Sequence, residues 1–284
     1  MAELDPREMN PAQWDEVAEN WARAAEEEEK GASADAARWM LEAAELQAGE
    51  RVLELACGAG RVGLQAAGQV GPDGTVLCSD FSEAMVGAVQ QRVDRLGIPN
   101  VDARVLNAED IDLDAEPFDI VLCRFGYMLM PDPAQALRES ARVLRPGGRL
   151  VLAVWGEGEK NLWLAAILKA VMSHLGAPPP KPGDPGPFSL GDPARLRELL
   201  DQAGFADVEV TELETAQTYD SLDAWWERIL DVGGPLAAIL SPMPEADREA
   251  IRDAALAVGR DFVADDGTAV FPASIVGAEA RKPD

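Results

Sequence analysis

One short segment of the sequence, VLELACGAGRVG (52–63), combines residue types that suit it to binding a ligand. A β-rich run leads directly into glycines, which permit a tight turn and let a ligand approach the backbone, and a helical pattern follows. Gly58, Gly60 and Gly63 match the G-x-G-x-x-G pattern of dinucleotide sites. Asp80 ends the next β-rich run, 20 residues after Gly60, where a carboxylate can accept both hydroxyls of a ribose. The loop and the acid together predict a site for a ligand that contains a nucleoside.

Glu54 bears on the kind of ligand, because it lies within a run expected to be a strand buried on both faces. An unpaired carboxylate in such a place is costly, and a nearby cation would offset that cost. The ammonium and sulfonium groups of S-adenosylmethionine would supply positive charge, whereas the pyrophosphate of a dinucleotide would not. The residue types also allow a purely structural interpretation, in which Glu54 forms a salt bridge with Arg51 or another arginine.

Two other functions are compatible with the glycine pattern. An NAD(P)-dependent oxidoreductase would use the pattern literally, but the sequence lacks a Tyr-x-x-x-Lys pair: Pro131 stands four residues after Tyr127, and Asp223 four residues after Tyr219. A non-catalytic cofactor-binding protein of the same fold would keep both the loop and Asp80. Only a measurement of catalytic turnover would distinguish such a binding protein from an enzyme.

The elements that would position these residues alternate between short β-rich runs and longer helical patterns. Predicted strands fall at 51–56, 75–80, 101–106, 118–124, 148–155, 206–213 and 268–280. The runs between Arg51 and Trp155 are nearly continuous in apolar residues, as in a parallel sheet that helices cover on both faces. We therefore expect an α/β fold with a doubly wound, mostly parallel, seven-stranded Rossmann-like sheet.

Helical segments before and after this core define its expected organisation. Residues 1–50 should form an N-terminal helical lid, and residues 51–156 the S-adenosylmethionine-binding core. Residues 157–284 should complete the sheet, with a proline-rich loop at 176–187 and a helical insertion at about 221–264 before the last strand. A proline in that strand, Pro272, marks a bulge or an edge position. The whole chain is expected to be one structural domain.

Composition and charge argue against several classes of protein. The chain has 284 residues, and 51 Asp and Glu against 25 Lys and Arg give a net charge of −26, which disfavours nucleic-acid and membrane-surface partners. Cys57, Cys78 and Cys123 are widely spaced in apolar runs, which indicates buried free thiols in a reducing compartment and no metal site. With no signal peptide and no apolar run of about 18 residues, the protein is predicted to be cytoplasmic and to have no membrane span.

Several motifs resemble those of class I S-adenosylmethionine-dependent methyltransferases. ELACGAG (54–60) is similar to motif I of that family, in the variant with Ala-Cys before the central glycine. CSDFSEAM (78–85) and LNAEDIDL (106–113) resemble the family's second-strand acid and the segment after its third strand. Residues 118–155 resemble its fourth strand, the helix that follows and a Pro-Gly-Gly turn. The match covers about residues 50–156 and is nearest to the small-molecule enzymes of ubiquinone and menaquinone biosynthesis.

The resemblance implies a set of cofactor-binding residues. Glu54 would meet the methionine ammonium through water, and Asp80 would hold the ribose hydroxyls. The other residues implied to contact the cofactor, through backbone or side chain, are Ala56, Gly58, Gly60, Phe81, Met85, Asn107, Ala108, Glu109 and Arg124. Among them, Phe81 and Met85 would pack against the adenine faces, and the turn at 107–109 would read the adenine edge.

Arg124 departs from the small residue that is commoner at the end of the family's fourth strand. Backbone carbonyls beside it would still suit the ammonium, while its guanidinium would suit an anionic group on the substrate or cofactor. An ion pair with Asp119 or Asp132 is the structural alternative.

Methyl transfer from a sulfonium is an in-line displacement that mainly requires alignment and exclusion of water. A base is needed only if the acceptor loses a proton, and Tyr127 and His174 are the two candidates for a catalytic residue. The residues expected to line an apolar acceptor pocket are Trp14, Trp21, Tyr127, Met128, Trp155 and Phe188. Of these, Trp14 and Trp21 share one helix face and would either cover the cofactor or belong to the core. The set predicts a small, lipophilic or aromatic acceptor and leaves open whether carbon, oxygen or nitrogen is methylated.

Overall fold

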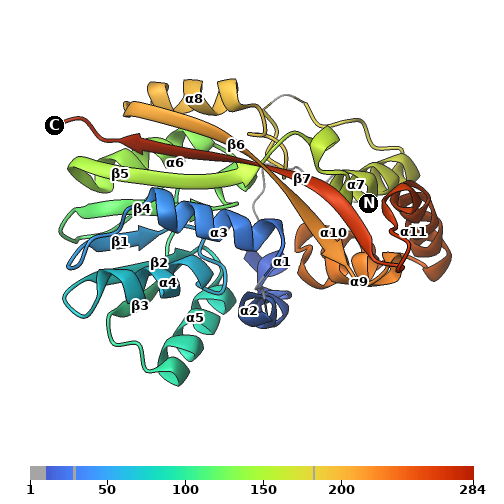
Figure 1. The fold of residues 1–284 in the computed structure, drawn as a ribbon, viewed down its shortest axis with the longest axis horizontal. Helices are drawn as coiled ribbons and strands as arrows, with labels where there is room; N and C mark the ends of the chain where they lie inside the picture. The colour runs from blue at the N-terminus through green and yellow to red at the C-terminus, as the bar shows by residue number, and fades with distance from the viewer. Residues whose placement is uncertain (1–10, 28–29, 182) are drawn as a thin grey trace.

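A seven-stranded sheet forms the centre of the molecule (Figure 1). The computed structural model describes residues 11–27, 30–181 and 183–284. The strands lie in the order β3-β2-β1-β4-β5-β7-β6, and every neighbouring pair is parallel except the two that involve β7. Their bounds are β1 (Arg51–Glu54), β2 (Thr75–Asp80), β3 (Val101–Val105), β4 (Phe118–Arg124), β5 (Leu144–Trp155), β6 (Ala206–Tyr219) and β7 (Ala269–Arg281). This arrangement confirms the predicted mostly parallel, Rossmann-like sheet.

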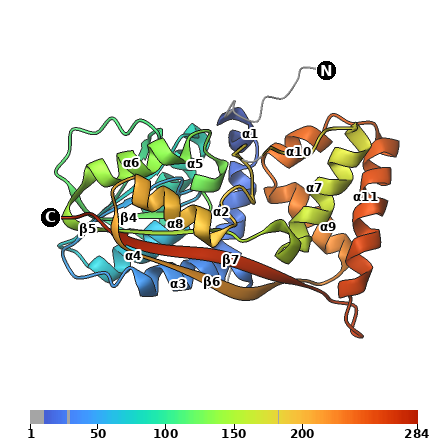
Figure 2. The same ribbon diagram turned by 90° about the horizontal axis from the view of Figure 1, so that it is seen from above.

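Helices cover both faces of the sheet. Their bounds are α1 (Pro11–Asp15), α2 (Ala18–Glu27), α3 (Ala32–Ala43), α4 (Arg61–Val70), α5 (Glu83–Leu96), α6 (Pro133–Val143), α7 (Leu162–Leu175), α8 (Pro193–Gln202), α9 (Leu222–Val232), α10 (Pro235–Leu240) and α11 (Glu245–Gly259), with short 3-10 turns at η1 (Tyr127–Leu129), η2 (Gly158–Lys160) and η3 (Arg260–Phe262). Figure 2 shows α3 and α4 on one side of the sheet and α6 and α8 on the other. The central strands β1 and β4 are therefore buried on both faces, as their apolar sequences require.

Local signals in the sequence account for several helix boundaries. Ser82 begins α5, because its Oγ accepts a hydrogen bond from the amide of Met85 at 3.1 Å, and Gly97 ends that helix in the left-handed region (φ 63°). Asp132 and Asp192 begin α6 and α8 in the same way, each with a proline at the first helical position. The start of α5 matters most, because it lies next to the end of β2.

The strands β6 and β7 extend beyond β5 as a two-stranded ribbon. β7 pairs with β5 only from Arg281 back to Ile275, whereas it pairs with β6 as far as Ala269. Pro272 lies in the extension, where β7 has a partner strand only in β6. This is the edge-like position expected of a proline in a strand.

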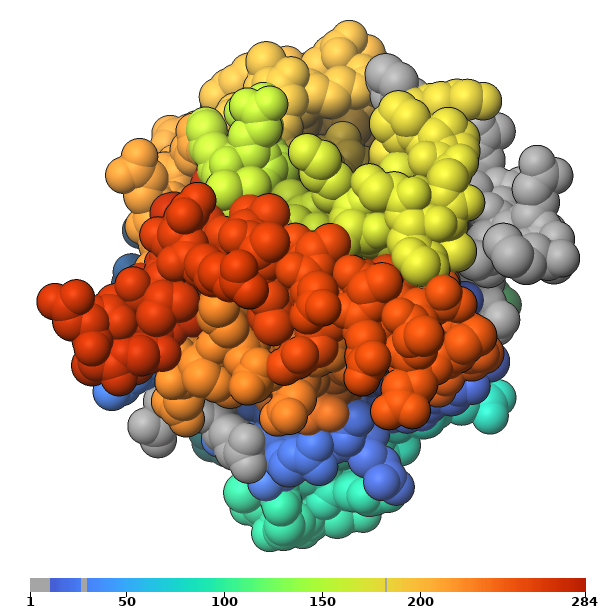
Figure 3. Space-filling model, turned by 90° about the vertical axis from the view of Figure 1, so that its right-hand side faces the viewer, coloured from blue at the N-terminus to red at the C-terminus, as the bar shows by residue number. Residues whose placement is uncertain are grey.

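Four helices, α7, α9, α10 and α11, gather at the end of this ribbon and are called the helical lobe here (Figures 1 and 2). Trp225 of α9 is fully buried and donates from Nε1 to the carbonyl of Trp163 in α7 at 2.7 Å. In Figure 3 the lobe faces the viewer, with the orange and red surface of α10 and α11 beside the yellow segment that contains the proline-rich tract. The helical insertion predicted at about 221–264 is present as three helices.

The N-terminal helices have two different places in the fold. α3 packs on the sheet, where Trp39 lies so close to Gly277 of β7 that a Cβ there would come within 2.4 Å of the indole. α1 and α2 lie between α5 and the helical lobe (Figure 2). Of the lid predicted at 1–50, residues 1–10, 28 and 29 fall outside the described part, and the lid itself stays a prediction. The segment boundaries at residues 50 and 156 stay predictions.

Candidate functional site

The carboxyl ends of β1 and β4 meet where the order of the strands changes direction. β2 and β3 follow on one side of β1, and β5 follows on the other side of β4. Ligands of open α/β sheets bind in the crevice at such a point. Ala56 after β1 (φ 49°) and Phe125 after β4 (φ 59°) both have positive φ, which residues other than glycine rarely adopt. Strained residues cluster at functional sites, so the backbone supports a site between these two strands.

The loop after β1 leaves its backbone open at Gly58. This residue has φ 53°, and a Cβ built on it would meet no atom within 4 Å. At Gly60, by contrast, a Cβ would lie 3.0 Å from Val89 of α5, so packing explains the second glycine. Gly58 is thus the position at which a ligand can approach the loop closely.

Glu54 ends β1 and is 2% exposed, as expected for a strand buried on both faces. Its Oε2 accepts the amide of Gly63 in α4 at 2.8 Å and lies 3.6 Å from Sγ of Cys78. Burial raises the pKa of Glu54 to about 7, while the Gly63 amide and the Arg124 guanidinium act in the opposite direction. A ligand cation nearby would further stabilise the charged form of this carboxyl.

Glu54 also explains the third glycine of the G-x-G-x-x-G pattern. A Cβ on Gly63 would lie 2.5 Å from Glu54 Oε2 and 2.4 Å from Cys78 Sγ. The literal match to a dinucleotide pattern therefore has a packing cause that involves no pyrophosphate. The alternative salt bridge from the sequence is not formed with Arg51, whose Nη2 donates to the carbonyl of Glu116 at 3.4 Å.

Asp80 ends β2 beside the glycine loop and is 6% exposed. Its Oδ2 accepts the amide of Gly58 at 2.9 Å, and its Oδ1 accepts the amide of Ser82 at 3.0 Å. Burial raises the pKa of Asp80, and these amides partly counteract the effect. Each carboxylate oxygen keeps a further lone pair, so Asp80 has the acceptors that a ribose diol requires.

Two residues assigned to the adenine faces lie at the start of α5. Phe81 is half-buried, and Met85 is 2% exposed. Trp14 of α1 and Trp21 of α2 pack with Met85, and their ring centres lie 6.4 Å apart. The two tryptophans belong to a small cluster separate from the main core, and their assignment to a lid stays a prediction.

The turn assigned to the adenine edge is held next to Asp80, whose carbonyl accepts the amide of Leu106 at 2.9 Å. Within the turn, Asn107 Oδ1 accepts the amide of Glu109 at 2.9 Å, and Ala108 is buried. Asn107 thus shapes its own turn and presents an exposed amide. The proposed reading of adenine by these residues stays a prediction.

Arg124 ends β4 and reaches toward the N-terminal helices. Its Nη1 donates to the carbonyl of Ser33 in α3 at 2.8 Å, and its Cζ lies 5.7 Å from the ring centre of Phe125. The two acids considered as alternative partners pair with other arginines, Asp119 with Arg145 and Asp132 with Arg138. Arg124 also places positive charge near Glu54, which counteracts part of the rise in the pKa of that carboxyl group.

Phe125 lies beside the candidate site, and sequence reasoning missed it. Its ring stacks on Trp155 with a centroid distance of 4.0 Å and an interplanar angle of 12°, and Trp155 meets Trp163 edge-on at 4.9 Å. Both tryptophans are 6% exposed, whereas Phe125 is half-buried and forms the accessible end of the row. An aromatic wall thus begins at the carboxyl end of β4. Only the place of Phe125 after the fourth strand could have indicated it, because its positive φ is a property of the folded chain.

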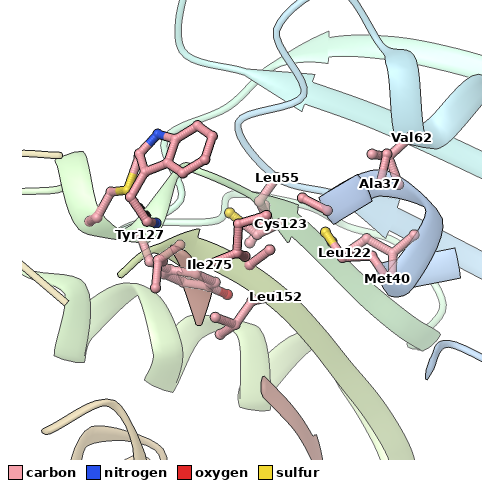
Figure 4. Close-up of a cluster of buried hydrophobic side chains, with 14 of the residues drawn as sticks. Ala37, Met40, Leu55, Val62, Leu122, Cys123, Tyr127, Leu152 and Ile275 are labelled. Atoms are coloured by element: carbon pink, nitrogen blue, oxygen red, sulfur yellow. Dashed lines mark hydrogen bonds between the residues drawn. The ribbon is translucent and has the colours of Figure 1, made fainter. Parts of the chain in front are cut away.

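Tyr127 is not part of the site, which corrects the sequence-based expectation for both catalysis and acceptor binding. It is fully buried, and its hydroxyl lies 2.6 Å from Oγ of Ser140 in α6. Figure 4 shows Tyr127 within the buried cluster that also contains Leu152 and Ile275. Burial raises the pKa of the phenol well above its ordinary value. An enclosed and bonded hydroxyl of this kind is a core group rather than a base.

Met128 and Phe188 lie where the proline-rich tract returns to the sheet. The carbonyl of Met128 accepts the amide of Gly186 at 2.9 Å and the hydroxyl of Ser189 at 2.6 Å. The Met128 side chain is 3% exposed and belongs to the core, and its place in an acceptor pocket stays a prediction. Phe188 is half-buried against Gly158 and stays a candidate for acceptor binding.

His174 lies in the helical lobe, in the last turn of α7. Its Nε2 is 3.2 Å from Oδ1 of Asp247 in α11, and its side chain is 30% exposed. The pair joins two helices of the lobe, so the structure favours a structural role for His174 over its expected role as a base.

The three cysteines, Cys57, Cys78 and Cys123, are buried free thiols, as predicted. Burial raises the pKa of both Cys57 and Cys123, which keeps these thiols protonated and unreactive. They are packing residues around the glycine loop.

The polar groups of this site fit S-adenosylmethionine. Asp80 offers two acceptors for the ribose, Gly58 leaves its backbone open, and the buried carboxyl of Glu54 would gain from an ammonium. A pyrophosphate would instead add a further anion beside two buried carboxyl groups, which is unfavourable.

Comparison with known proteins places the central part of the chain in a family. Residues 46–176 match a family model described as a methyltransferase domain. Methyltransferase tpcH of Aspergillus fumigatus is 29% identical over 153 residues, which cover 49% of this chain and 50% of that protein. Demethylmenaquinone methyltransferase of Listeria welshimeri is 36% identical over 116 residues, 40% of this chain and 49% of that protein. The chain thus spans about half the length of the curated relatives it matches.

Solved structures share the fold over most of the chain. The YcgJ protein of Bacillus subtilis superposes with a TM-score of 0.60 at 19% identity, over 88% of this chain and 99% of that one. Phosphoethanolamine N-methyltransferase 2 of Haemonchus contortus, solved with S-adenosylhomocysteine, superposes with a TM-score of 0.57 at 19% identity, over 88% of this chain and 53% of that one. At these identities the likeness concerns the fold. The family match therefore identifies residues 46–176 as similar to a methyltransferase domain, and the solved structures show that the chain shares the fold of such proteins.

Proposed function

We propose that this protein transfers the methyl group of S-adenosylmethionine to a small acceptor and releases S-adenosylhomocysteine. The family match and the sheet order support the proposal. The observation that carries it is the pair of buried carboxyl groups, Glu54 and Asp80, each hydrogen-bonded to the glycine-rich segment after β1. Their arrangement suits a ligand that carries both an ammonium and a ribose.

Each of these residues has a role in binding that follows from its surroundings. Glu54 attracts the ammonium, Asp80 accepts the ribose hydroxyls, and Gly58 lets the ligand pass close to the backbone. When bound, S-adenosylmethionine supplies an electrophilic methyl group on a positively charged sulfur. The further residues that we assign to the cofactor are Ala56, Gly60, Phe81, Met85, Asn107, Ala108, Glu109 and Arg124.

The acceptor in this proposal is flat and lipophilic or aromatic. The stack of Phe125 on Trp155 offers an aromatic surface at the carboxyl ends of β4 and β5. Trp14 and Trp21 of the lid and Phe188 after the proline-rich tract add apolar surface. The relatives named demethylmenaquinone methyltransferases support the same class of acceptor.

The chain contributes alignment and exclusion of water to the reaction rather than proton transfer. An in-line displacement requires the acceptor atom, the methyl group and the sulfur to lie in line, which a rigid aromatic wall promotes. Tyr127 is enclosed in the core, and His174 pairs with Asp247 in the helical lobe. We therefore assign no general base.

Titration calorimetry with S-adenosylmethionine, S-adenosylhomocysteine and NADH in parallel tests the cofactor. Binding of the first two ligands and not of NADH is the expected result. Binding of NADH alone would overturn the proposal and favour an oxidoreductase. Binding of S-adenosylmethionine without methyl transfer to any member of a panel of phenols, quinols and amines would favour a non-catalytic cofactor-binding protein of this fold.

The proposed partner is a small molecule. A net charge of −26 opposes binding to nucleic acid. Among residues 11–27, 30–181 and 183–284, no helix is both long enough and apolar enough to pass through a bilayer. The cytoplasmic location stays a prediction.

A further inference from the structure

Helices α1 and α2, residues 11–27, form a strap that contacts both the sheet domain and the helical lobe. On the side of the sheet, Val17, Ala18 and the two strap tryptophans pack around Met85 of α5. On the side of the lobe, Ala237 of α10 packs on the same cluster. One short segment therefore spans the sheet domain, which would bind the cofactor, and the helical lobe.

At the sheet end, the strap is hydrogen-bonded to the residues that orient Asp80, the carboxylate proposed to bind the ribose hydroxyls. Asp15 Oδ1 accepts the hydroxyl of Ser82 at 2.5 Å and the amide of Ala84 at 3.3 Å. The same hydroxyl oxygen of Ser82 accepts the amide of Met85, and the Ser82 amide donates to Asp80 Oδ1 at 3.0 Å. Because the amino end of a helix favours negative charge, Asp15 is well placed at the start of α5. A continuous chain of hydrogen bonds thus runs from Asp15 through Ser82 to Asp80.

At the lobe end, the strap satisfies the last carbonyl groups of α9. Asn20 Nδ2 donates to the carbonyl of Asp231, and Trp21 Nε1 to the carbonyl of Val232, both at 3.0 Å. Helix carboxyl ends lack intrahelical donors for these groups, so the two bonds have a structural value of their own. The Trp14 ring also lies over Gly234, where a Cβ would come within 3.1 Å of it.

We propose that Asp15 is a positioning residue for Asp80, and that the strap makes the affinity for the cofactor depend on its contacts with the helical lobe. The inference rests on the proposed function, since it takes Asp80 to be the residue that binds the ribose hydroxyls. Asp15 fixes the Ser82 hydroxyl and the first turn of α5, and so fixes the amide that orients Asp80. Because Asn20 and Trp21 are hydrogen-bonded to α9, a shift of α9 would move the strap and change the position of Asp15 relative to Ser82. By linkage, a ligand that alters the lobe alters cofactor affinity, and the cofactor alters affinity at the lobe by the same factor.

Calorimetric titration with S-adenosylhomocysteine tests the positioning role. Asp15→Asn should weaken binding by about fivefold in the otherwise unchanged protein, since an amide oxygen is a poorer acceptor than a carboxylate. In an Asp80→Ala background the same substitution should have no further effect, because Asp15 acts through Asp80. Glu16→Gln is the matched control, with the same loss of charge on the neighbouring exposed residue, and should bind as the unsubstituted protein does. Equal losses in both backgrounds, or no loss in Asp15→Asn, would overturn the role.

The link to the lobe is tested with Trp21→Phe, which keeps an aromatic ring but removes the donor to Val232 together with part of the indole's packing surface. It should weaken S-adenosylhomocysteine binding and speed amide hydrogen exchange across residues 11–27 in the ligand-free protein. Combined with Asp15→Asn, its effect on binding should be less than the product of the separate effects, and independent effects would overturn the link. If the unsubstituted protein binds no S-adenosylhomocysteine, the proposed function fails, whereas the exchange data still report whether both ends hold the strap.

Discussion

The amide of Gly63 and the carboxyl group of Glu54 are joined by a hydrogen bond of 2.8 Å that connects the first turn of α4 to the end of β1. The two residues form a unit, because any side chain at position 63 would occupy the place of the Glu54 carboxyl group. A glycine pattern that would otherwise indicate a dinucleotide is thereby tied to an acid that suits a cationic ligand.

Gly63→Ala tests this unit through stability. The added methyl group would displace Glu54 Oε2 and Cys78 Sγ, and overpacking of this kind costs about 1–3 kcal/mol. Gly68→Ala in the same helix is the control, since nothing lies within 4 Å of its Cβ position, and it should stabilise the protein by about 0.5–1 kcal/mol. Urea unfolding measures both. Equal free energies of unfolding for the two variants would contradict the packing argument.

The pKa of Glu54 predicts how the stability of the ligand-free protein depends on pH. Since the folded-state pKa of about 7 exceeds the ordinary value of 4.5, the folded state binds this proton more tightly than the unfolded state. The resulting stabilisation is complete below about pH 4.5 and is lost as the pH rises through about 7. Glu54→Gln should therefore show a smaller fall in the free energy of unfolding over this range. Asp80, whose pKa is also raised, leaves a residual slope of the same sign. Identical slopes in the two proteins would contradict the assignment.

Ligand affinity should show the opposite dependence on pH. The ammonium of S-adenosylhomocysteine is attracted by ionised Glu54, so affinity should rise as the pH increases through about 7. In Glu54→Gln that rise should be much smaller, because an amide cannot ionise. Calorimetry at about one pH unit on either side of 7 measures both proteins. A rise of the same size in the variant would mean that another group controls the pH dependence.

The sequence predicted best those features that are local. The glycine loop, Glu54 and Asp80 follow directly from a strand, a turn and the next strand, and the structure brings them together as expected. The sheet could be predicted equally well from the sequence, because buried parallel strands are nearly continuous in apolar residues.

The predictions that failed concern side chains whose direction depends on tertiary packing. Tyr127 follows β4 at the expected edge of the sheet, but the 3-10 turn there directs its ring into the core toward Ser140. Phe125, two residues earlier, lies beside the candidate site because its backbone adopts a positive φ, which no sequence pattern predicts. The bonds of Trp21 and Asp15 join segments far apart in the chain, so no local pattern indicates them.

Asp80→Ala addresses the cofactor site most directly. Loss of the carboxylate removes both ribose acceptors and frees the amides of Gly58 and Ser82, so affinity for S-adenosylhomocysteine should fall at least tenfold, about 1.4 kcal/mol or more. Asp73→Ala, at an exposed residue in the turn before β2, is the matched control and should leave affinity unchanged. Unchanged affinity in Asp80→Ala would show that the ribose site is assigned to the wrong residue.

Tyr127→Phe separates a core role from a catalytic one. The change removes one hydroxyl, which is bonded to Ser140 and enclosed, so the free energy of unfolding should fall by about 1 kcal/mol. The turnover number should stay within about twofold once an acceptor is known, because general-base catalysis contributes about a hundredfold or more and would be lost with the phenol. Ser140→Ala leaves the phenol buried without its partner, and the double variant should be less destabilised than the sum of the two changes. A hundredfold loss of turnover in Tyr127→Phe with unchanged stability would return Tyr127 to the catalytic site.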